Sequence, residues 1–307
     1  MKKYRIVFMG TPSYATTILK ALLQADDMEV CALFTQPDKK AGRGQSLNFP
    51  HIKQFVADEG LDIGIFQPES VKNTDIHQQI SALKPDFIIV AAYGKILPRA
   101  VLDIAPCINL HASLLPLYRG ASPIQQAILN DERYSGVTAM SMEEGLDTGD
   151  ILGFSYCDIK ELDSDALFEL LSQKAAGLTL KVIRSYENIL HIKQNDALSS
   201  KTAKISKDDG LVDFDFGWRE LKQKLLALTP WPGLFLSSGL KLKSFECEAS
   251  GTNAKSGQII KINDESVSVA CKDGVVKLLK VQAPSKGEIS ASSYVNGQRI
   301  KVGDTFY

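Results

Sequence analysis

The stretch INLHASLLPLYRG, residues 108–120, places an amide and an imidazole side by side where an apolar run ends. Because side chains alternate along a strand, Asn109 and His111 share one face. Both groups can donate hydrogen bonds to a carbonyl oxygen that becomes an oxyanion during a reaction. The alternative is a buried histidine that bonds to an asparagine in the core and takes no part in chemistry.

A carboxylate follows in the Gly-bounded loop GLDTGD, residues 145–150. This loop comes after an apolar run at 136–142, and we expect it to bring Asp147 to the same carboxyl edge of the sheet as His111. A carboxylate beside an imidazole favours the charged, proton-donating ring. Asp147 could instead only close a turn, as Asp near Gly often does. We predict that Asn109, His111 and Asp147 form a catalytic trio.

The first half of the chain alternates short apolar runs with helical spacing, which predicts an α/β domain with a parallel sheet. Ligands bind such sheets at the carboxyl ends of the strands, where His111 is expected. The predicted strands are 4–9, 29–35, 63–66, 86–92, 106–111 and 136–142, and the predicted helices are 13–25, 50–58, 74–83 and 122–130.

The pattern changes after a long amphipathic helix predicted at 164–190. We expect a first domain over 1–190, a polar linker over 191–207 and a β-rich second domain over 208–307, with a helical piece near 217–228. Several short strands separated by turn residues favour a small barrel. Its predicted strands are 234–236, 241–247, 257–262, 266–271, 275–281 and 299–302.

Composition excludes several classes of protein. The net charge is −1, so the 307-residue chain is not a general polycation that coats nucleic acid. Five cysteines without a C-x-x-C pair indicate a reduced, cytoplasmic protein whose thiols pack in the core. No segment predicts a signal peptide or membrane span, and Gly10 alone does not make a dinucleotide fingerprint. The four histidines and five cysteines show no metal-ligand spacing, so we expect no metal.

The loop TQPDKKAGRGQSLNFP, residues 35–50, is long for a connection between a strand and a helix. It carries Lys39, Lys40 and Arg43. It could be a solvated surface loop, or a flexible arm that places cations on phosphates. Alternating lysines in the second domain leave the same choice between a solvated face and a nucleic-acid-binding face.

Seven motifs together resemble those of the methionyl-tRNA formyltransferases, and the match spans nearly the whole chain. In order they are FMGTP, TQPDKKAGRG, AAYGKILP, INLHASLLPLYRG followed by ASPIQ, GVTAMSMEEGLDTGDIL, KISKDDG and TPWPG. N-x-H-x-SLLP with a later D-x-GD is shared by the wider 10-formyltetrahydrofolate-dependent formyltransferases. The AGRG loop, GLDTGD and the PWPG-bearing second domain are more particular to the tRNA enzymes.

The resemblance implies a Rossmann-like domain with helices on both faces of a parallel sheet, followed by an OB-like β-barrel that binds tRNA. It implies transfer of a formyl group from 10-formyltetrahydrofolate to the amino group of methionyl initiator tRNA. We expect a monomer. Asn109, His111 and Asp147 match the catalytic trio. Residues matching the folate-binding positions are Ser113, Leu114, Leu115, Pro116, Tyr93, Gly94, Ile96 and Leu97. Arg43 matches the loop arginine that approaches the tRNA acceptor end, and we expect Lys39, Lys40 and Lys204 to bind tRNA as well.

One departure from the family pattern is Leu117, where a basic residue is common before the aromatic-Arg-Gly sequence. The same catalytic core could also formylate a sugar-nucleotide amine or another small amine, or hydrolyse the formyl-folate. The chain could instead be a non-catalytic RNA-binding protein, but the intact trio argues against this alternative.

Overall fold

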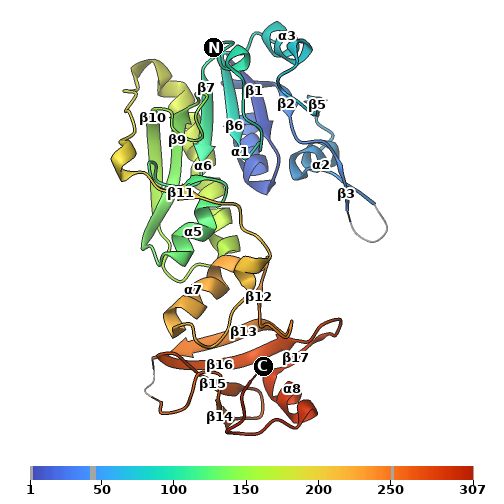
Figure 1. Cartoon of the computed structure of the whole chain (residues 1–307). Coiled ribbons are helices and arrows are strands. Elements are labelled where there is room, and N and C mark those ends of the chain that lie inside the picture. The colour runs from blue at the N-terminus through green and yellow to red at the C-terminus, as the bar shows by residue number, and fades with distance from the viewer. Residues whose placement is uncertain (1–2, 42–45, 250–251, 307) are drawn as a thin grey trace. The chain divides into compact units, whose positions relative to one another are not determined.

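The computed structural model describes residues 3–41, 46–249 and 252–306, and the chain forms two compact units (Figure 1). The first unit comprises residues 1–123, 134–158 and 167–202. The second comprises residues 124–133, 159–166 and 203–307. The segment 191–202, which falls within the predicted linker, thus belongs to the first unit.

A seven-stranded sheet forms the centre of the first unit, with the strand order β10-β9-β7-β6-β1-β2-β5. Five neighbouring strands run parallel, and their near-continuous apolar sequences fit a sheet that is buried on both faces. The strands are β1 (Tyr4–Gly10), β2 (Met28–Phe34), β5 (Gly64–Phe66), β6 (Phe87–Ala91), β7 (Cys107–His111), β9 (Tyr134–Ser141) and β10 (Ile151–Asp158).

The prediction that residues 136–142 form another parallel strand is wrong. β9 runs antiparallel to β7, with His111 opposite Thr138, and β10 runs antiparallel to β9. A parallel neighbour needs a crossover that returns along the sheet. The connection between β7 and β9 makes no such crossover, because it brings the start of β9 beside the end of β7.

The helices in the described residues are α1 (Ser13–Gln24), α2 (His51–Asp58), α3 (Thr74–Ala82), α4 (Arg99–Leu102), α5 (Pro123–Leu129), α6 (Ser164–Ser185), α7 (Trp218–Leu228) and α8 (Ala291–Gln298). Six of these helices match predicted helices, whereas α4 and α8 were not predicted. Two small sheets were not predicted. β3 (Lys39–Ala41) pairs with β4 (Ser46–Asn48), and β8 (Arg119–Gly120) pairs with β11 (Lys201–Thr202).

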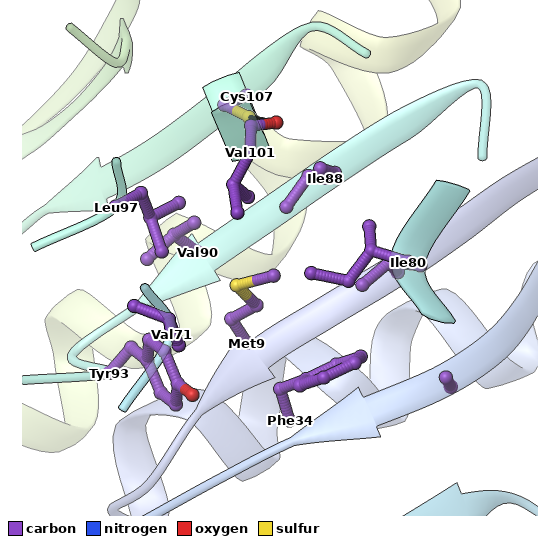
Figure 2. Packing of buried hydrophobic residues seen from close by; sticks show 12 residues of the cluster. Met9, Phe34, Val71, Ile80, Ile88, Val90, Tyr93, Leu97, Val101 and Cys107 are labelled. Atoms are coloured by element: carbon purple, nitrogen blue, oxygen red, sulfur yellow. Dashed lines mark hydrogen bonds between the residues drawn. The ribbon is translucent and has the colours of Figure 1, made fainter. Parts of the chain in front are cut away.

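One face of the parallel sheet carries a buried apolar cluster (Figure 2). Met9 of β1, Phe34 of β2 and Ile88 of β6 point to the same side, where Ile80 of α3 covers them. Alternation along each strand selects these residues, because every second side chain faces this layer. This packing fixes the positions of β6 and β1, and through β6 that of β7.

The second unit contains a six-stranded antiparallel sheet, with the order β12-β13-β16-β15-β14 and β17 beside β16. The predicted β-rich second domain is therefore confirmed, but the strand predicted at 299–302 is wrong. Arg299 instead ends α8 in a left-handed conformation, with φ 59°. The strands are β12 (Leu234–Phe235), β13 (Lys241–Glu248), β14 (Ile259–Ile262), β15 (Val267–Cys271), β16 (Gly274–Gln282) and β17 (Glu288–Ser290).

The cysteines lie in their expected apolar surroundings to different degrees. Cys107 and Cys271 are buried, and the other three are half-buried. Burial raises the pKa of Cys107 and of Cys247 to about 12, which leaves both thiols protonated near neutral pH.

Among the described residues, no helix has the length and apolar composition that a membrane span requires.

Ile88→Ala tests the importance of the apolar cluster. Ile88 is fully buried, so its truncation leaves a cavity and should lower the free energy of unfolding by about 2–5 kcal/mol. Urea denaturation followed by circular dichroism measures this change. Leu190→Ala is the control, because Leu190 is 78% exposed and its loss should change the free energy by less than about 0.5 kcal/mol. Equal effects of the two substitutions would contradict the assignment of the core.

Candidate active site

β7 presents Asn109 and His111 on one face, as the alternation in the sequence predicts. Asn109 lies opposite Val90 of β6 and Met140 of β9, so the strand is held on both sides. The phenol of Tyr14 donates a hydrogen bond to the carbonyl oxygen of Leu110, at 3.2 Å. β7 is therefore a rigid support for the two polar side chains.

The His111 ring is buried, and both of its nitrogens have defined neighbours. Nε2 donates a hydrogen bond to the carbonyl oxygen of Tyr118, at 2.9 Å. Because a carbonyl only accepts, the proton of the neutral ring lies on Nε2. Nδ1 faces Oδ2 of Asp147 at 3.6 Å. A second proton on the ring would therefore lie on the side of Asp147.

The Asp147 carboxylate connects three parts of the first unit. Its Oδ1 lies 3.4 Å from Nδ2 of Asn109, which donates to it. Its Oδ2 accepts a hydrogen bond of 2.9 Å from the backbone N–H of Gly120 and faces His111. Only 11% of the Asp147 side chain is exposed. The structure thus brings the three predicted catalytic residues together around one carboxylate.

Asp147 reaches this position by a route that the sequence did not predict. The loop 142–150 begins where the N–H of Met142 bonds to the carbonyl oxygen of Cys107, at the start of β7. The expectation that the loop begins at the carboxyl edge is wrong, because β9 runs antiparallel. The loop must return along β7 to bring Asp147 to His111. Asp147 adopts a left-handed conformation with φ 54°, which is uncommon outside glycine.

Residues of the predicted linker hold this loop and its neighbours in place. Nε2 of Gln194 donates to the carbonyl oxygens of Asp147 and Gly149, at 2.9 and 2.7 Å. The Ser200 hydroxyl accepts a hydrogen bond from the N–H of Tyr118, whose carbonyl orients His111. Sequence reasoning missed Gln194 and Ser200. Their segment is polar and aperiodic, so only its turn-rich composition was readable.

The predicted folate loop, Ser113–Pro116, follows directly after His111 and is internally hydrogen-bonded. The Ser113 hydroxyl donates to the carbonyl oxygen of Leu117, and the Thr138 hydroxyl donates to the carbonyl oxygen of Ser113, at 2.6 and 2.7 Å. The N–H of Leu115 bonds to the same Thr138 hydroxyl. These bonds fix the loop against β9. Leu115 is buried, whereas Leu114 and Pro116 are half-buried.

The second predicted folate segment, residues 93–97, divides between the core and the surface. The side chains of Tyr93 and Leu97 are 1% exposed and belong to the apolar cluster of Figure 2. Burial raises the pKa of Tyr93 to about 12. Gly94 and Ile96 are exposed, and Gly94 adopts φ 75°. Of the four residues predicted to bind folate in this segment, only Gly94 and Ile96 are accessible to a ligand.

The predicted tRNA-binding residues are spread along the chain. Lys39 and Lys204 are exposed, Lys40 lies in β3, and Arg43 lies outside the described residues. The start of their loop is anchored through Asp38. Lys53 and Gln67 donate to its two carboxylate oxygens at 2.6 and 2.7 Å, and they lower the pKa of Asp38. The anchor holds the segment that leads into β3.

Asn109, His111 and Asp147 supply an amide donor, a titratable ring and a carboxylate within one small site. This set suits acyl transfer, in which an oxyanion forms and a proton moves. Within the described ranges, no group of three or more His, Cys, Asp or Glu side chains is placed to hold a metal ion.

Comparison with known proteins identifies the family. A family model described as "Formyl transferase" matches residues 4–181, and one described as "Formyl transferase, C-terminal domain" matches residues 204–299. A methionyl-tRNA formyltransferase from a Nitratiruptor species is 50% identical over 304 residues, which cover 99% of this chain and 100% of the relative. The chain belongs to the methionyl-tRNA formyltransferase family. The resemblance found in the sequence motifs is confirmed.

Solved structures support the formyltransferase fold at lower identity. HypX from Aquifex aeolicus in complex with tetrahydrofolic acid has a TM-score of 0.63 and 16% identity, over 98% of this chain and 49% of the HypX chain. An N-formyltransferase from Helicobacter canadensis, in complex with folinic acid and dTDP-3-aminofucose, has a TM-score of 0.64 and 18% identity. That match covers 92% of this chain and 100% of the other. At such low identities, the comparison shows only that this chain and these two proteins share a fold.

Gly149→Ala tests whether the loop geometry supports formyl transfer. A Cβ at Gly149 would lie 1.8 Å from the carbonyl oxygen of Ser141, so the loop carrying Asp147 must shift. Because a displacement of about 1 Å can cost on the order of 100-fold in rate, we expect a loss of that size in kcat. Steady-state formylation kinetics measure it.

Gly177→Ala in α6 is the matched control. Nothing lies within 4 Å of the added Cβ, so activity should stay at the parent level. A parental kcat for Gly149→Ala would contradict the close approach between the loop and β9.

Proposed function

We propose that this enzyme transfers the formyl group of 10-formyltetrahydrofolate to the α-amino group of methionyl initiator tRNA, and that Asn109, His111 and Asp147 carry the chemistry. The convergence of Asn109 and His111 on the Asp147 carboxylate is the observation that supports these roles. We further propose that the protein acts as a cytoplasmic monomer.

The reaction begins when the amine of methionine attacks the formyl carbon, which forms a C–N bond and a tetrahedral oxyanion. The amine then loses a proton to Asp147 or to a water molecule. When the intermediate collapses, the bond between the formyl carbon and the folate nitrogen breaks. That nitrogen takes up a proton as it leaves, so the transfer is balanced without a net change in protons.

Two donors stabilise the oxyanion. The Asn109 amide has two N–H groups. One donates to Asp147 at 3.4 Å, and the other can donate to the oxyanion. Protonated His111 carries its second proton on Nδ1, which lies 3.6 Å from Oδ2 of Asp147, farther than a hydrogen bond. This N–H can therefore donate to an oxyanion that lies between Nδ1 of His111 and Nδ2 of Asn109. One such donor typically contributes about 10²–10³-fold to the rate.

The formyl donor fits the surroundings of His111. The loop Ser113–Pro116 is rigidly bonded and directly follows the catalytic strand, so it can hold a flat ring system in a fixed position. Gly94 and Ile96 supply the accessible part of the second folate segment. We assign Tyr93 and Leu97 to the support of that segment, because their side chains are buried in the core. The folate-bound formyltransferase folds described above are consistent with this ligand class.

The tRNA contacts are assigned to cations of both units. Lys39, Lys40 and Arg43 belong to the loop 35–50, and Lys204 begins the KISKDDG motif. Phosphate contacts of this kind position an RNA without reading its sequence. The hydrogen bonds from Lys53 and Gln67 to Asp38 hold the start of this loop in place.

The lysines of β13 and β16 add little net charge, because Glu246 and Glu248 offset Lys241 and Lys243 on β13. Both lysines of β16, Lys277 and Lys280, pair with glutamates.

The alternative acceptor is a sugar-nucleotide amine. The Helicobacter canadensis structure contains such a molecule, but it is only 18% identical to this chain. The relative named for tRNA is 50% identical over essentially the full length of both chains. This difference favours methionyl-tRNA.

A formyl-transfer assay with charged initiator tRNA, charged elongator tRNA and a sugar-nucleotide amine tests the proposal. We expect rapid formylation of the initiator tRNA and little of the other two. Activity with the sugar-nucleotide amine alone would overturn the proposed function.

Arg43→Ala tests the role of the loop. Loss of one phosphate contact should raise the KM for charged tRNA about tenfold and leave the KM for the formyl donor unchanged. Lys72→Ala removes a cation from an exposed site outside the loop and serves as control. If both variants behave like the parent enzyme, the loop does not contact tRNA.

A further inference from the structure

The Gln194 side chain is fixed at both ends of its amide. Its Oε1 accepts a hydrogen bond of 3.0 Å from Nε of Arg119. Its Nε2 donates to the carbonyl oxygens of Asp147 and Gly149, at 2.9 and 2.7 Å. The oxygen of the amide thus faces Arg119, and its nitrogen faces the loop 142–150.

Arg119 determines which way the amide points. A guanidinium can only donate hydrogen bonds, so it requires the oxygen of Gln194 on its side. The Arg119 side chain is 5% exposed, and its other end donates to Asp196 at 2.8 Å. Its backbone N–H bonds to the carbonyl oxygen of Ser200, at 2.9 Å. With Arg119 held in this way, the NH₂ of Gln194 must face the loop.

The two carbonyls that Gln194 binds belong to the residues on either side of Thr148. Asp147 has φ 54°, a conformation that a non-glycine residue keeps only where its surroundings hold it. The donor on the carbonyl of Asp147 fixes the peptide plane that follows Asp147, and the donor on the carbonyl of Gly149 fixes the plane two residues further along the loop. The direction of the Asp147 side chain depends on the first of these planes.

Gln194 is itself anchored to the sheet. Ile192 and Ile151 exchange two backbone hydrogen bonds, at 2.8 and 3.0 Å. On the other side, Lys201–Thr202 of β11 pairs with Arg119–Gly120 of β8. The segment 191–202 is therefore tied to the beginning of β10 and to the chain that follows the folate loop.

We propose that Gln194 is a positioning residue for formyl transfer, which holds Asp147 in the left-handed conformation that directs its carboxylate to Asn109 and His111. The inference rests on the proposed catalytic role of Asp147. The hydrogen bonds of Gln194 go to Arg119 and to the backbone of the loop, so its effect on the trio passes through the backbone of Asp147.

Gln194→Glu is the sharpest test. A glutamate keeps the length of the side chain and its bond with Arg119, but it places an acceptor oxygen against two carbonyl oxygens. We expect kcat to fall about 10–100-fold with the KM for both substrates changed less than about threefold, because the site is misaligned and not lost. Gln194→Met, which packs similarly but forms no hydrogen bond, should lose kcat in the same way.

Gln79→Glu on the exposed face of α3 is the matched control for the charge change and should keep the parental kcat. The thermal midpoint of each variant shows that it is folded. A parental kcat in folded Gln194→Glu and Gln194→Met would overturn the positioning role. The parent enzyme in the same assay separates this outcome from failure of the proposed function, in which the parent itself transfers no formyl group to methionyl-tRNA.

The Asp147→Asn background distinguishes positioning from general structural support. If Gln194 acts through the Asp147 carboxylate, adding Gln194→Met to Asp147→Asn should lower the residual kcat less than about twofold. If Gln194→Met lowers kcat by the same factor in the Asp147→Asn enzyme as in the parent, Gln194 acts independently of Asp147 and the proposal is wrong.

Discussion

The carboxylate of Asp147 is the interaction on which the site depends. It accepts from the Asn109 side chain and from the Gly120 backbone, and it faces Nδ1 of His111. Without it, Asn109 and His111 would be two polar groups on a strand with no common partner. With it, an amide donor and a titratable ring are oriented toward the same point, which is the arrangement that stabilisation of an oxyanion requires.

The direction of β9 explains why Asp147 needs so much support. Because β9 runs antiparallel to β7, the loop that follows it begins at the amino end of β7. It must then return to His111 within a few residues. The positive φ of Asp147 and the close approach of Gly149 to Ser141 are consequences of that return. The polar segment 191–202 supplies the hydrogen bonds that stabilise the resulting conformation.

Much of this site could be predicted from local patterns. The alternation around Asn109 and His111 correctly placed both side chains on one face, and the Gly-bounded loop correctly indicated Asp147 as their partner. Apolar runs gave the parallel strands because those strands are buried on both faces. The catalytic roles of the trio and the contacts with folate and tRNA stay predictions.

Other features depend on long-range contacts that no local pattern carries. The direction of β9 depends on where the preceding connection returns the chain to the sheet, and not on the apolar run itself. Gln194 lies in a polar stretch with no periodicity, and its importance comes from partners 45 and 47 residues away. Tyr93 and Leu97 match a ligand-binding motif, yet their side chains serve the core. A motif match shows which segment lines a site, but the packing decides which of its side chains are accessible.

The most direct test of the role of Asp147 is the single-turnover rate of formyl transfer to methionyl initiator tRNA by Asp147→Asn, at saturating concentrations of both substrates. An asparagine has nearly the same shape but lacks the negative charge that faces His111. We predict a folded protein that still binds the folate and transfers formyl at least about 100-fold more slowly, as expected when a charged catalytic group is lost. A rate within about twofold of the parent enzyme would contradict the central role of Asp147.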